Sequence, residues 1–293
     1  MMKSTQEEML KQFIAWGEPQ DSVRAMLMTS SRATPLGQVD ILSDYDLILV
    51  VTDIHPFFNS RLWLQGFGRV LTLYRDPLMR DGDFETVGYI VQFEDGLKID
   101  FTVWPIGLMQ RIVAEPQLPT ELDAGYQILL DKDGLTEDLK SPTYKGYIPT
   151  PPTEAAYQEK IELFFLDAIY VAKFLWRDDM VAAKHLLDHF LKQDYLIPML
   201  EWRSEIDHNW TVKRGPFGRR LKQWLRPDLW TELESTYTGA DIAANWDALF
   251  KSIALMRRVS LDVGHHLGYA YPHDLEQRAT AYIHEIKNLN RPE

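Results

Sequence analysis

The sequence contains no cysteine. This absence excludes a disulfide framework, a thiolate metal site and a cysteine nucleophile. The chain also lacks a run of about 18 apolar residues, which a membrane-spanning helix requires. Its first residues, MMKSTQEEMLKQF, carry charges where a secretory signal needs an apolar core. We therefore expect a cytoplasmic protein with no membrane partner.

Positive charge is also scarce. The chain has 31 Lys and Arg against 43 Asp and Glu, a formal net charge of −12. Nucleic-acid phosphates bind to basic surfaces, so this balance argues against a nucleic-acid partner. An acidic surface attracts a cationic small molecule, but the same acidity also serves solubility alone. Composition leaves both interpretations open.

Length and composition predict two domains. The 293 residues, 45% of them hydrophobic, are more than one core usually needs and supply enough apolar material for two. The segment 141–153, SPTYKGYIPTPPT, holds four prolines and one glycine, a composition typical of a semi-rigid linker. We place one domain at 1–145 and a second at 150–293.

The first domain mixes helices and strands. Thr5 and Glu8 form a capping box, which predicts an amphipathic helix ending near Gly17. Strands are predicted at 23–28, 47–51, 70–74, 88–93, 97–104 and 126–130, and short helices at 61–67 and 106–114. The uninterrupted apolar run at 47–51 indicates a strand covered on both faces. The predicted fold is an α/β (α+β) domain with a mixed sheet.

The second domain is predicted to be an all-α helical bundle. Thr153 caps a helix that runs to about residue 176, and Asp178 opens a longer helix that Pro198 should kink. Further helices are predicted at 217–225, 228–237, 241–267 and 273–289. Short connections between successive helices are typical of a bundle.

Residues with catalytic chemistry gather in the stretch 25–53. A Ser-Ser-Arg turn at 30–32 follows an apolar strand, and Asp44 and Asp46 enter the next one. Alternate residues of a strand share a face, so these two carboxylates repel each other unless a cation lies between them. Asp100, in a later strand, adds a third carboxylate.

This residue set suits phosphoryl chemistry with metal ions. Three carboxylates supply the hard oxygen ligands that Mg²⁺ prefers. Two such ions can activate an attacking hydroxyl and stabilise a leaving pyrophosphate. The serine turn offers backbone N–H groups, hydroxyls and a guanidinium for a polyphosphate.

The order SSR, SDYD and KID resembles the nucleotidyltransferase superfamily pattern of Gly-Ser, Asp-x-Asp and a third acid. The strings SRATPLGQVDILSDYDLILVVTD, FEDGLKIDFTVWPI and YVAKFLWRDDMVAAKHLLDH look like the aminoglycoside 6-adenylyltransferases. The resemblance implies a nucleotidyltransferase domain followed by a helical substrate-binding domain. It also implies transfer of AMP from MgATP to a hydroxyl of the streptidine ring of streptomycin, with release of pyrophosphate. We expect a monomer whose partners are ATP and a cationic aminoglycoside.

The resemblance also implies residue roles. It makes Asp44 and Asp46 metal ligands and Ser31 a phosphate contact. Asp100 becomes either a ligand of a second metal or the base that takes the proton of the attacking hydroxyl. Ser30 stands where the superfamily has a glycine, the residue that lets backbone approach phosphate without steric cost.

Other residues are predicted to contact the substrates. Asp178 and Asp179 are predicted to bind the guanidinium groups of streptomycin, since bidentate pairing between a carboxylate and a guanidinium is a strong recognition element. Glu94, beside the third acid, is an alternative base on the substrate side. Further predicted nucleotide contacts are Ser30, Arg32, Lys173 and Lys184.

Two other functions stay open from the sequence. The same chemistry could act on another acceptor, such as a different aminoglycoside, a lincosamide or a protein hydroxyl. A non-catalytic nucleotide- or drug-binding protein of the same fold is the alternative from a different class. The intact set of three aspartates argues against this second alternative, because carboxylates that repel each other have no use without a cation.

Overall fold

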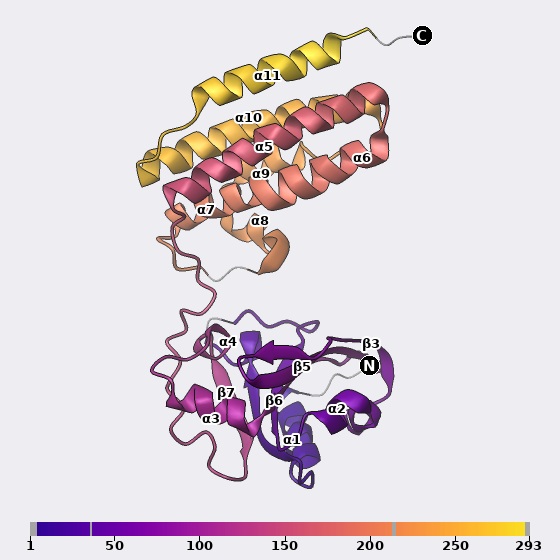
Figure 1. Cartoon of the computed structure of the whole chain (residues 1–293), viewed down its shortest axis with the longest axis vertical. Helices are drawn as coiled ribbons and strands as arrows, with labels where there is room; N and C mark the ends of the chain where they lie inside the picture. The colour runs from indigo at the N-terminus through magenta and orange to yellow at the C-terminus, as the bar shows by residue number, and fades with distance from the viewer. Residues whose placement is uncertain (1–4, 36, 213–214, 291–293) are drawn as a thin grey trace. The chain divides into compact units, whose positions relative to one another are not determined.

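The computed structural model describes residues 5–35, 37–212 and 215–290. The chain forms two compact units, residues 1–147 and 148–293 (Figure 1). The first is built on a mixed β-sheet and the second on helices, which confirms the predicted fold class. Within the described ranges, every helix is too short or too polar to cross a membrane.

In the described part of the N-terminal unit, seven strands form one sheet in the order β3-β5-β6-β2-β1-β7, with β4 paired to β5. The strands are β1 (Val23–Thr29), β2 (Tyr45–Val51), β3 (Val70–Arg75), β4 (Met79–Asp81), β5 (Phe84–Phe93), β6 (Lys98–Pro105) and β7 (Tyr126–Asp131). The helices are α1 (Gln6–Gly17), α2 (His55–Asn59), α3 (Ile106–Ala114) and α4 (Thr120–Asp123), with 3₁₀ turns η1 (Ser30–Arg32) and η2 (Leu62–Gly66). The sequence did not predict β4, a three-residue strand.

Strand β2 is the centre of this unit because both of its faces are buried. Leu47 and Leu49 join the core beneath α1, whose predicted capping box at Thr5 is present. Ile48 and Val50 join the core beneath α3 on the opposite face. The alternation of side chains along a strand therefore leaves polar residues of β2 only at its beginning.

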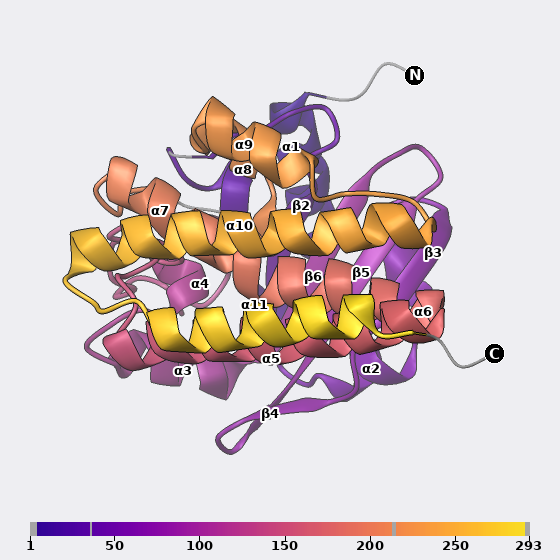
Figure 2. The same cartoon turned by 90° about the horizontal axis from the view of Figure 1, so that it is seen from above.

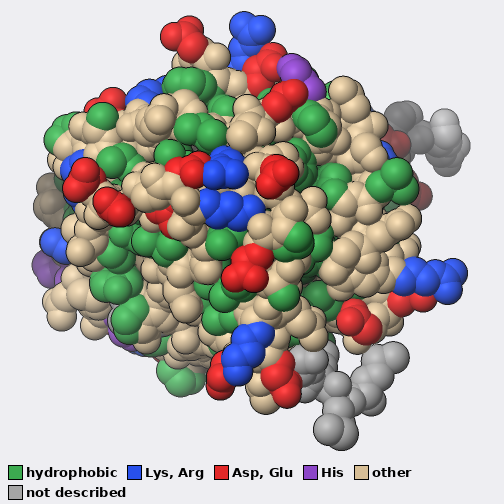
Figure 3. All heavy atoms as spheres, turned by 90° about the horizontal axis from the view of Figure 1, so that it is seen from below, with side chains coloured by type: hydrophobic (Ala, Val, Ile, Leu, Met, Phe, Trp, Pro, Cys, Tyr) green, Lys and Arg blue, Asp and Glu red, His purple; other side chains and the backbone are tan. Residues whose placement is uncertain are grey.

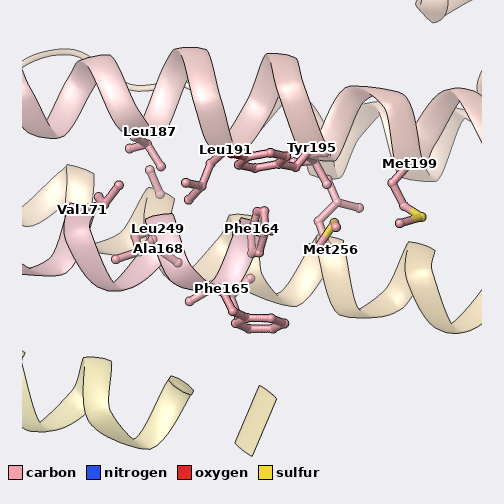
Figure 4. Packing of buried hydrophobic residues seen from close by; sticks show 14 of the residues in the cluster. Phe164, Phe165, Ala168, Val171, Leu187, Leu191, Tyr195, Met199, Leu249 and Met256 are labelled. Carbon is pink, nitrogen blue, oxygen red and sulfur yellow. The ribbon is translucent and has the colours of Figure 1, made fainter. Parts of the chain in front are cut away.

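The C-terminal unit is a bundle of helices, as predicted. It contains α5 (Glu154–Arg177), α6 (Met180–Lys184), a π-helical segment η3 (His185–Leu196), α7 (Ile197–Asp207), the 3₁₀ turn η4 (Pro216–Gly218), α8 (Leu221–Trp224), α9 (Pro227–Glu234), α10 (Ile242–Leu267) and α11 (His273–Asn288). Figure 2 shows α5, α10 and α11 lying alongside one another. In the core, Phe164 and Phe165 of α5 pack with Leu191 of η3 and Met256 of α10 (Figure 4).

Two boundaries in this unit differ from prediction. Asp178 does not open a helix; it closes α5 in the left-handed conformation, with φ 65°, and the next helix begins at Met180. The predicted helix 217–225 is interrupted, because Phe217 and Arg220 have φ values of 59° and 65°, which end regular helical hydrogen bonding.

The sequence predicted a helix kink at Pro198. The structure places a π-helical segment immediately before α7, and Pro198 lies in the first turn of α7. Proline has no N–H, so in an α-helix the carbonyl of Asp194, four residues earlier, would lose its donor. Lys160 supplies a replacement: its Nζ donates to the Asp194 carbonyl at 2.8 Å.

Candidate active site

The serine turn follows directly from the end of β1. Ser30 has φ 59°, the left-handed conformation that glycine adopts without strain and that other residues seldom adopt. The turn therefore keeps a glycine-type backbone although its residue is serine. The Ser30 hydroxyl donates a hydrogen bond to the carboxylate of Asp46, a contact that glycine could not make.

A close backbone approach fixes the loop after this turn. Gly37 lies so near the turn that a Cβ on it would stand 1.7 Å from the carbonyl oxygen of Ser31. Only glycine fits that space. The loop thus folds back over Ser31 before the chain enters β2.

The three predicted carboxylates meet at one end of two neighbouring strands. Strand β2 pairs in parallel with β6, and Asp46 stands opposite Asp100 in that register. Asp44 immediately precedes β2, two residues from Asp46. The structure thus brings Ser30, Asp44, Asp46 and Asp100 together, from positions as far as 70 residues apart (100 − 30).

Electrostatics in this cluster are unfavourable for ionised acids. Burial, followed by the charges of Asp44 and Asp100, raises the pKa of Asp46 to about 7. Burial and the charge of Asp44 also raise the pKa of Asp100 above its ordinary value, although Lys98 opposes the shift. Both shifts follow from placing like charges together in a partly dry environment.

A lysine that the sequence analysis did not single out lies among these acids. Nζ of Lys98 is 2.5 Å from Oδ2 of Asp44 and 2.8 Å from Oδ2 of Asp100. Burial lowers the pKa of Lys98, but its hydrogen bonds to the two carboxylates outweigh that effect, and the pKa is raised overall. The string KID indicates this proximity of Lys98 to Asp100, because residues two apart on a strand share a face.

Arg32 has partners within the protein. Its guanidinium donates to the backbone carbonyls of Asp44 at 2.8 Å and Ser43 at 2.7 Å, and lies 4.0 Å from the centre of the Tyr45 ring. Arg32 therefore fastens the loop that carries the first carboxylate. Contact between Arg32 and a phosphate stays a prediction.

A cavity of about 620 Å³ adjoins the carboxylate cluster within the N-terminal unit. It lies between the beginning of α1, the loop before β2 and the turn before β6. Its lining residues are Gln6, Met9, Arg32, Val39, Asp40, Ile41, Leu42, Ser43, Tyr45, Asp95, Gly96, Leu97 and Lys98. Lys98 therefore faces both the cavity and the carboxylates.

The remaining predicted residues belong to other elements of the two units. Glu94, in the turn between β5 and β6, forms an ion pair with Arg69 at 3.1 Å. In the C-terminal unit, Lys173 lies 5.3 Å from the ring centre of Tyr170. These placements do not test the predicted substrate contacts.

Two further predictions concern the region around the break after α5. Asp178 and Asp179 are both exposed at this break. Lys184 pairs with Asp188 at 2.6 Å and donates to the carbonyl of Thr238 at 2.8 Å. Lys184 thus has structural partners of its own, whereas the two aspartates face solvent.

The donor set of the cluster fits a hard divalent cation. All three acids offer carboxylate oxygens, which Mg²⁺ prefers. Oδ1 of Asp100 is buried and has no hydrogen-bond partner among the described residues. In this conformation no three acidic or histidine side chains of residues 5–35, 37–212 and 215–290 converge as metal ligands. The ammonium of Lys98 lies between two of the three carboxylates instead.

A mixed sheet that gathers a serine turn and three strand-end carboxylates, followed by a helical unit, defines the chain as a nucleotidyltransferase. The family model of streptomycin adenylyltransferases matches residues 2–286, so the chain belongs to that family. This match confirms the resemblance found in the sequence. Enzymes of this class use a nucleotide and, in general, a divalent metal.

Individual relatives agree with the family. The aminoglycoside 6-adenylyltransferase of Bacillus subtilis (strain 168) is 27% identical over 285 residues, which cover 96% of this chain and 98% of that protein. The aminoglycoside 6-adenylyltransferase of Campylobacter jejuni is 27% identical over 256 residues, covering 85% of each chain. A crystal structure of an aminoglycoside 6-adenyltransferase from Bacillus subtilis is 25% identical, with a TM-score of 0.47, and covers 98% of this chain and 100% of its own.

Two substitutions separate the effect of backbone strain at Ser30 on stability from the effect of its hydrogen bond. Ser30→Ala and Ser30→Gly both remove the donor to Asp46, but only the glycine relieves the left-handed strain. We expect Ser30→Gly to be more stable than Ser30→Ala by about 1 kcal/mol in urea unfolding. Equal stability of the two variants would show that the turn stores no strain.

The raised pKa of Asp46 predicts a pH-dependent stability. From about pH 4 to pH 7 the folded state keeps a proton that the unfolded chain has lost, so stability falls as the pH rises through this window. Asp46→Asn should therefore exceed the wild type in unfolding free energy at pH 8, by a margin that shrinks toward pH 4. The measurement is urea unfolding with a chelator present, with Asp53→Asn as the control. A margin independent of pH contradicts the prediction.

Proposed function

We propose that this protein transfers AMP from ATP to a hydroxyl of streptomycin, on the streptidine ring, with release of pyrophosphate. The observation that carries the proposal is the meeting of Asp44, Asp46 and Asp100 beside the serine turn, in a chain of the streptomycin adenylyltransferase family. Relatives that bear the name aminoglycoside 6-adenylyltransferase along nearly the whole chain support this acceptor class.

In this proposal Asp44, Asp46 and Asp100 hold Mg²⁺ together with the ATP phosphates, and two ions suit the reaction best. When bound, the metal supplies positive charge for the phosphoryl oxygens and for the leaving pyrophosphate. Backbone N–H groups of the serine turn, with the Ser31 hydroxyl, bind the polyphosphate. ATP is the co-substrate, which places the reaction in the cytoplasm.

Asp100 is the proposed base. Lys98 contacts its Oδ2, the oxygen that would serve the metal, while its Oδ1 is buried without a hydrogen-bond partner among the described residues and can accept a proton. Burial and the charge of Asp44 raise the pKa of Asp100 above its ordinary value, which makes this carboxylate a better proton acceptor than a free one. In the transfer, the acceptor oxygen bonds to the α-phosphorus, the bond from that phosphorus to the pyrophosphate oxygen breaks, and Asp100 takes the hydroxyl proton.

The acceptor is a cation, and its recognition follows from charge. Streptidine carries two guanidinium groups, and exposed carboxylates such as Asp178 and Asp179 can each accept two hydrogen bonds from one of them. The net charge of −12 attracts such a molecule. On the face seen in Figure 3, basic and acidic side chains are intermixed. A monomer suffices for this chemistry.

The acceptor is tested by pyrophosphate release. With MgATP, the folded protein should release pyrophosphate when streptomycin is added, and mass spectrometry should find AMP on the drug. Aminoglycosides without guanidinium groups should give much less, since they lack the groups that pair with carboxylates. If no acceptor causes pyrophosphate release, the proposal is wrong. If only another acceptor causes release, that molecule and not streptomycin is the substrate.

The carboxylate roles are tested by isosteric amides. Asp100→Asn should lose at least about 100-fold in turnover, because the amide cannot take a proton. Asp46→Asn should lose a similar factor through the loss of a metal ligand, while its thermal stability stays equal or rises. Asp53→Asn, just beyond the opposite end of β2, is the matched control and should keep wild-type turnover. Wild-type turnover in either active-site variant would show that the active site has been assigned to the wrong residues.

A further inference from the structure

Lys98 is the one cation that the described structure places between the candidate metal ligands. It begins β6, and its Nζ joins Oδ2 of Asp44 at 2.5 Å and Oδ2 of Asp100 at 2.8 Å. These two oxygens come from different strands and would otherwise repel each other. In this conformation the ammonium therefore reduces the repulsion between the two carboxylates, as a bound metal ion would.

One ammonium leaves the cluster incompletely neutralised. Three carboxylates face one positive charge, and Lys98 contacts only Asp44 and Asp100. Oδ1 of Asp100 is buried without a partner among the described residues. Asp46 receives a hydrogen bond from the neutral hydroxyl of Ser30. The oxygens that Lys98 does not satisfy still favour a divalent cation.

The surroundings of Lys98 give its side chain somewhere to move. The Lys98 side chain is 31% exposed, and it lines the cavity of about 620 Å³ beside the cluster. By contrast, the side chain of Lys192, which pairs with Asp188 in the helical unit, is 0% exposed. A lysine with a long flexible stem and open space beside it can break its ion pairs at little steric cost.

We propose that Lys98 is an exchangeable internal cation. It holds Asp44 and Asp100 together before a divalent ion arrives, and it moves its ammonium into the adjoining cavity when the ion binds to them. Lys98 is thus a positioning residue that competes with the metal and prevents the empty site from opening under repulsion. This inference rests on the metal site of the proposed function.

The first test compares Mn²⁺ binding to the wild type and to Lys98→Met, without nucleotide, by calorimetry. If only about a tenth of wild-type molecules have the carboxylates free of Lys98, the variant should bind about tenfold more tightly. With a chelator present the variant should melt at a lower temperature than the wild type, and Mn²⁺ should recover the difference. The control is Lys132→Met, which removes a lysine that donates to the carbonyls of Gly17 and Gln20. Its Mn²⁺ affinity should equal that of the wild type.

A second measurement uses the wild type alone and stands even if Lys98→Met fails to fold. Acetylation of individual lysines is followed by mass spectrometry with and without Mg²⁺. Mg²⁺ should raise the labelling rate of Lys98 several-fold and leave Lys132 unchanged. This result separates movement of Lys98 from simple charge repulsion of the metal, which would leave the labelling rate unchanged.

The outcomes separate this inference from the function on which it rests. Equal Mn²⁺ affinity in the wild type and Lys98→Met overturns the proposed exchange of Lys98 with the metal. It does not bear on AMP transfer, which the pyrophosphate assay tests separately. An unchanged labelling rate of Lys98 also overturns the exchange. Failure of both proteins to bind Mn²⁺ without nucleotide also overturns the exchange, because Lys98 then has no ion to yield to. AMP transfer is still tested by its own assay, since the ATP phosphates supply further metal ligands in that reaction.

Discussion

The parallel pairing of β2 with β6 sets the position of Asp46 opposite Asp100, and the residue before β2 adds Asp44. Burial and, after it, repulsion between neighbouring carboxylates penalise the ionised acids at the end of this strand pair, and the pKa values of Asp46 and Asp100 are raised accordingly. The fold tolerates the cluster because Lys98 neutralises one charge and two apolar cores anchor β2 on both faces. Burial around the strand thus offsets repulsion at its end.

The serine turn shows a second compromise of the same kind. Ser30 occupies a backbone conformation suited to glycine, and its hydroxyl donates a hydrogen bond to the carboxylate of Asp46. The glycine-type backbone is the feature that lets N–H groups approach a phosphate. The departure from the superfamily pattern therefore leaves a glycine-type backbone conformation in place.

Local signals in the sequence were enough for most of the fold. The capping box at Thr5 and the apolar run of β2 each act within a few residues, and the structure contains both elements. Features that depend on distant partners were not predictable in this way. The role of Lys98 requires the pairing of β6 with β2, and the contacts of Arg32 require the loop that Gly37 folds back. The short segment β4 carries too little pattern to be recognised.

The site therefore exists only when the sheet is complete. Asp44 and Asp46 come before α2, β3, β4 and β5, whereas Lys98 and Asp100 come after them. Closing so long a connection between parallel strands is entropically unfavourable until the apolar faces of both strands are buried. Once they are, the carboxylates are held close together, and their energy falls when they keep a proton or bind a cation. The pairing of β2 with β6 thus brings the carboxylates together at a cost to folding stability, and it also positions them to bind a metal ion or the ammonium of Lys98.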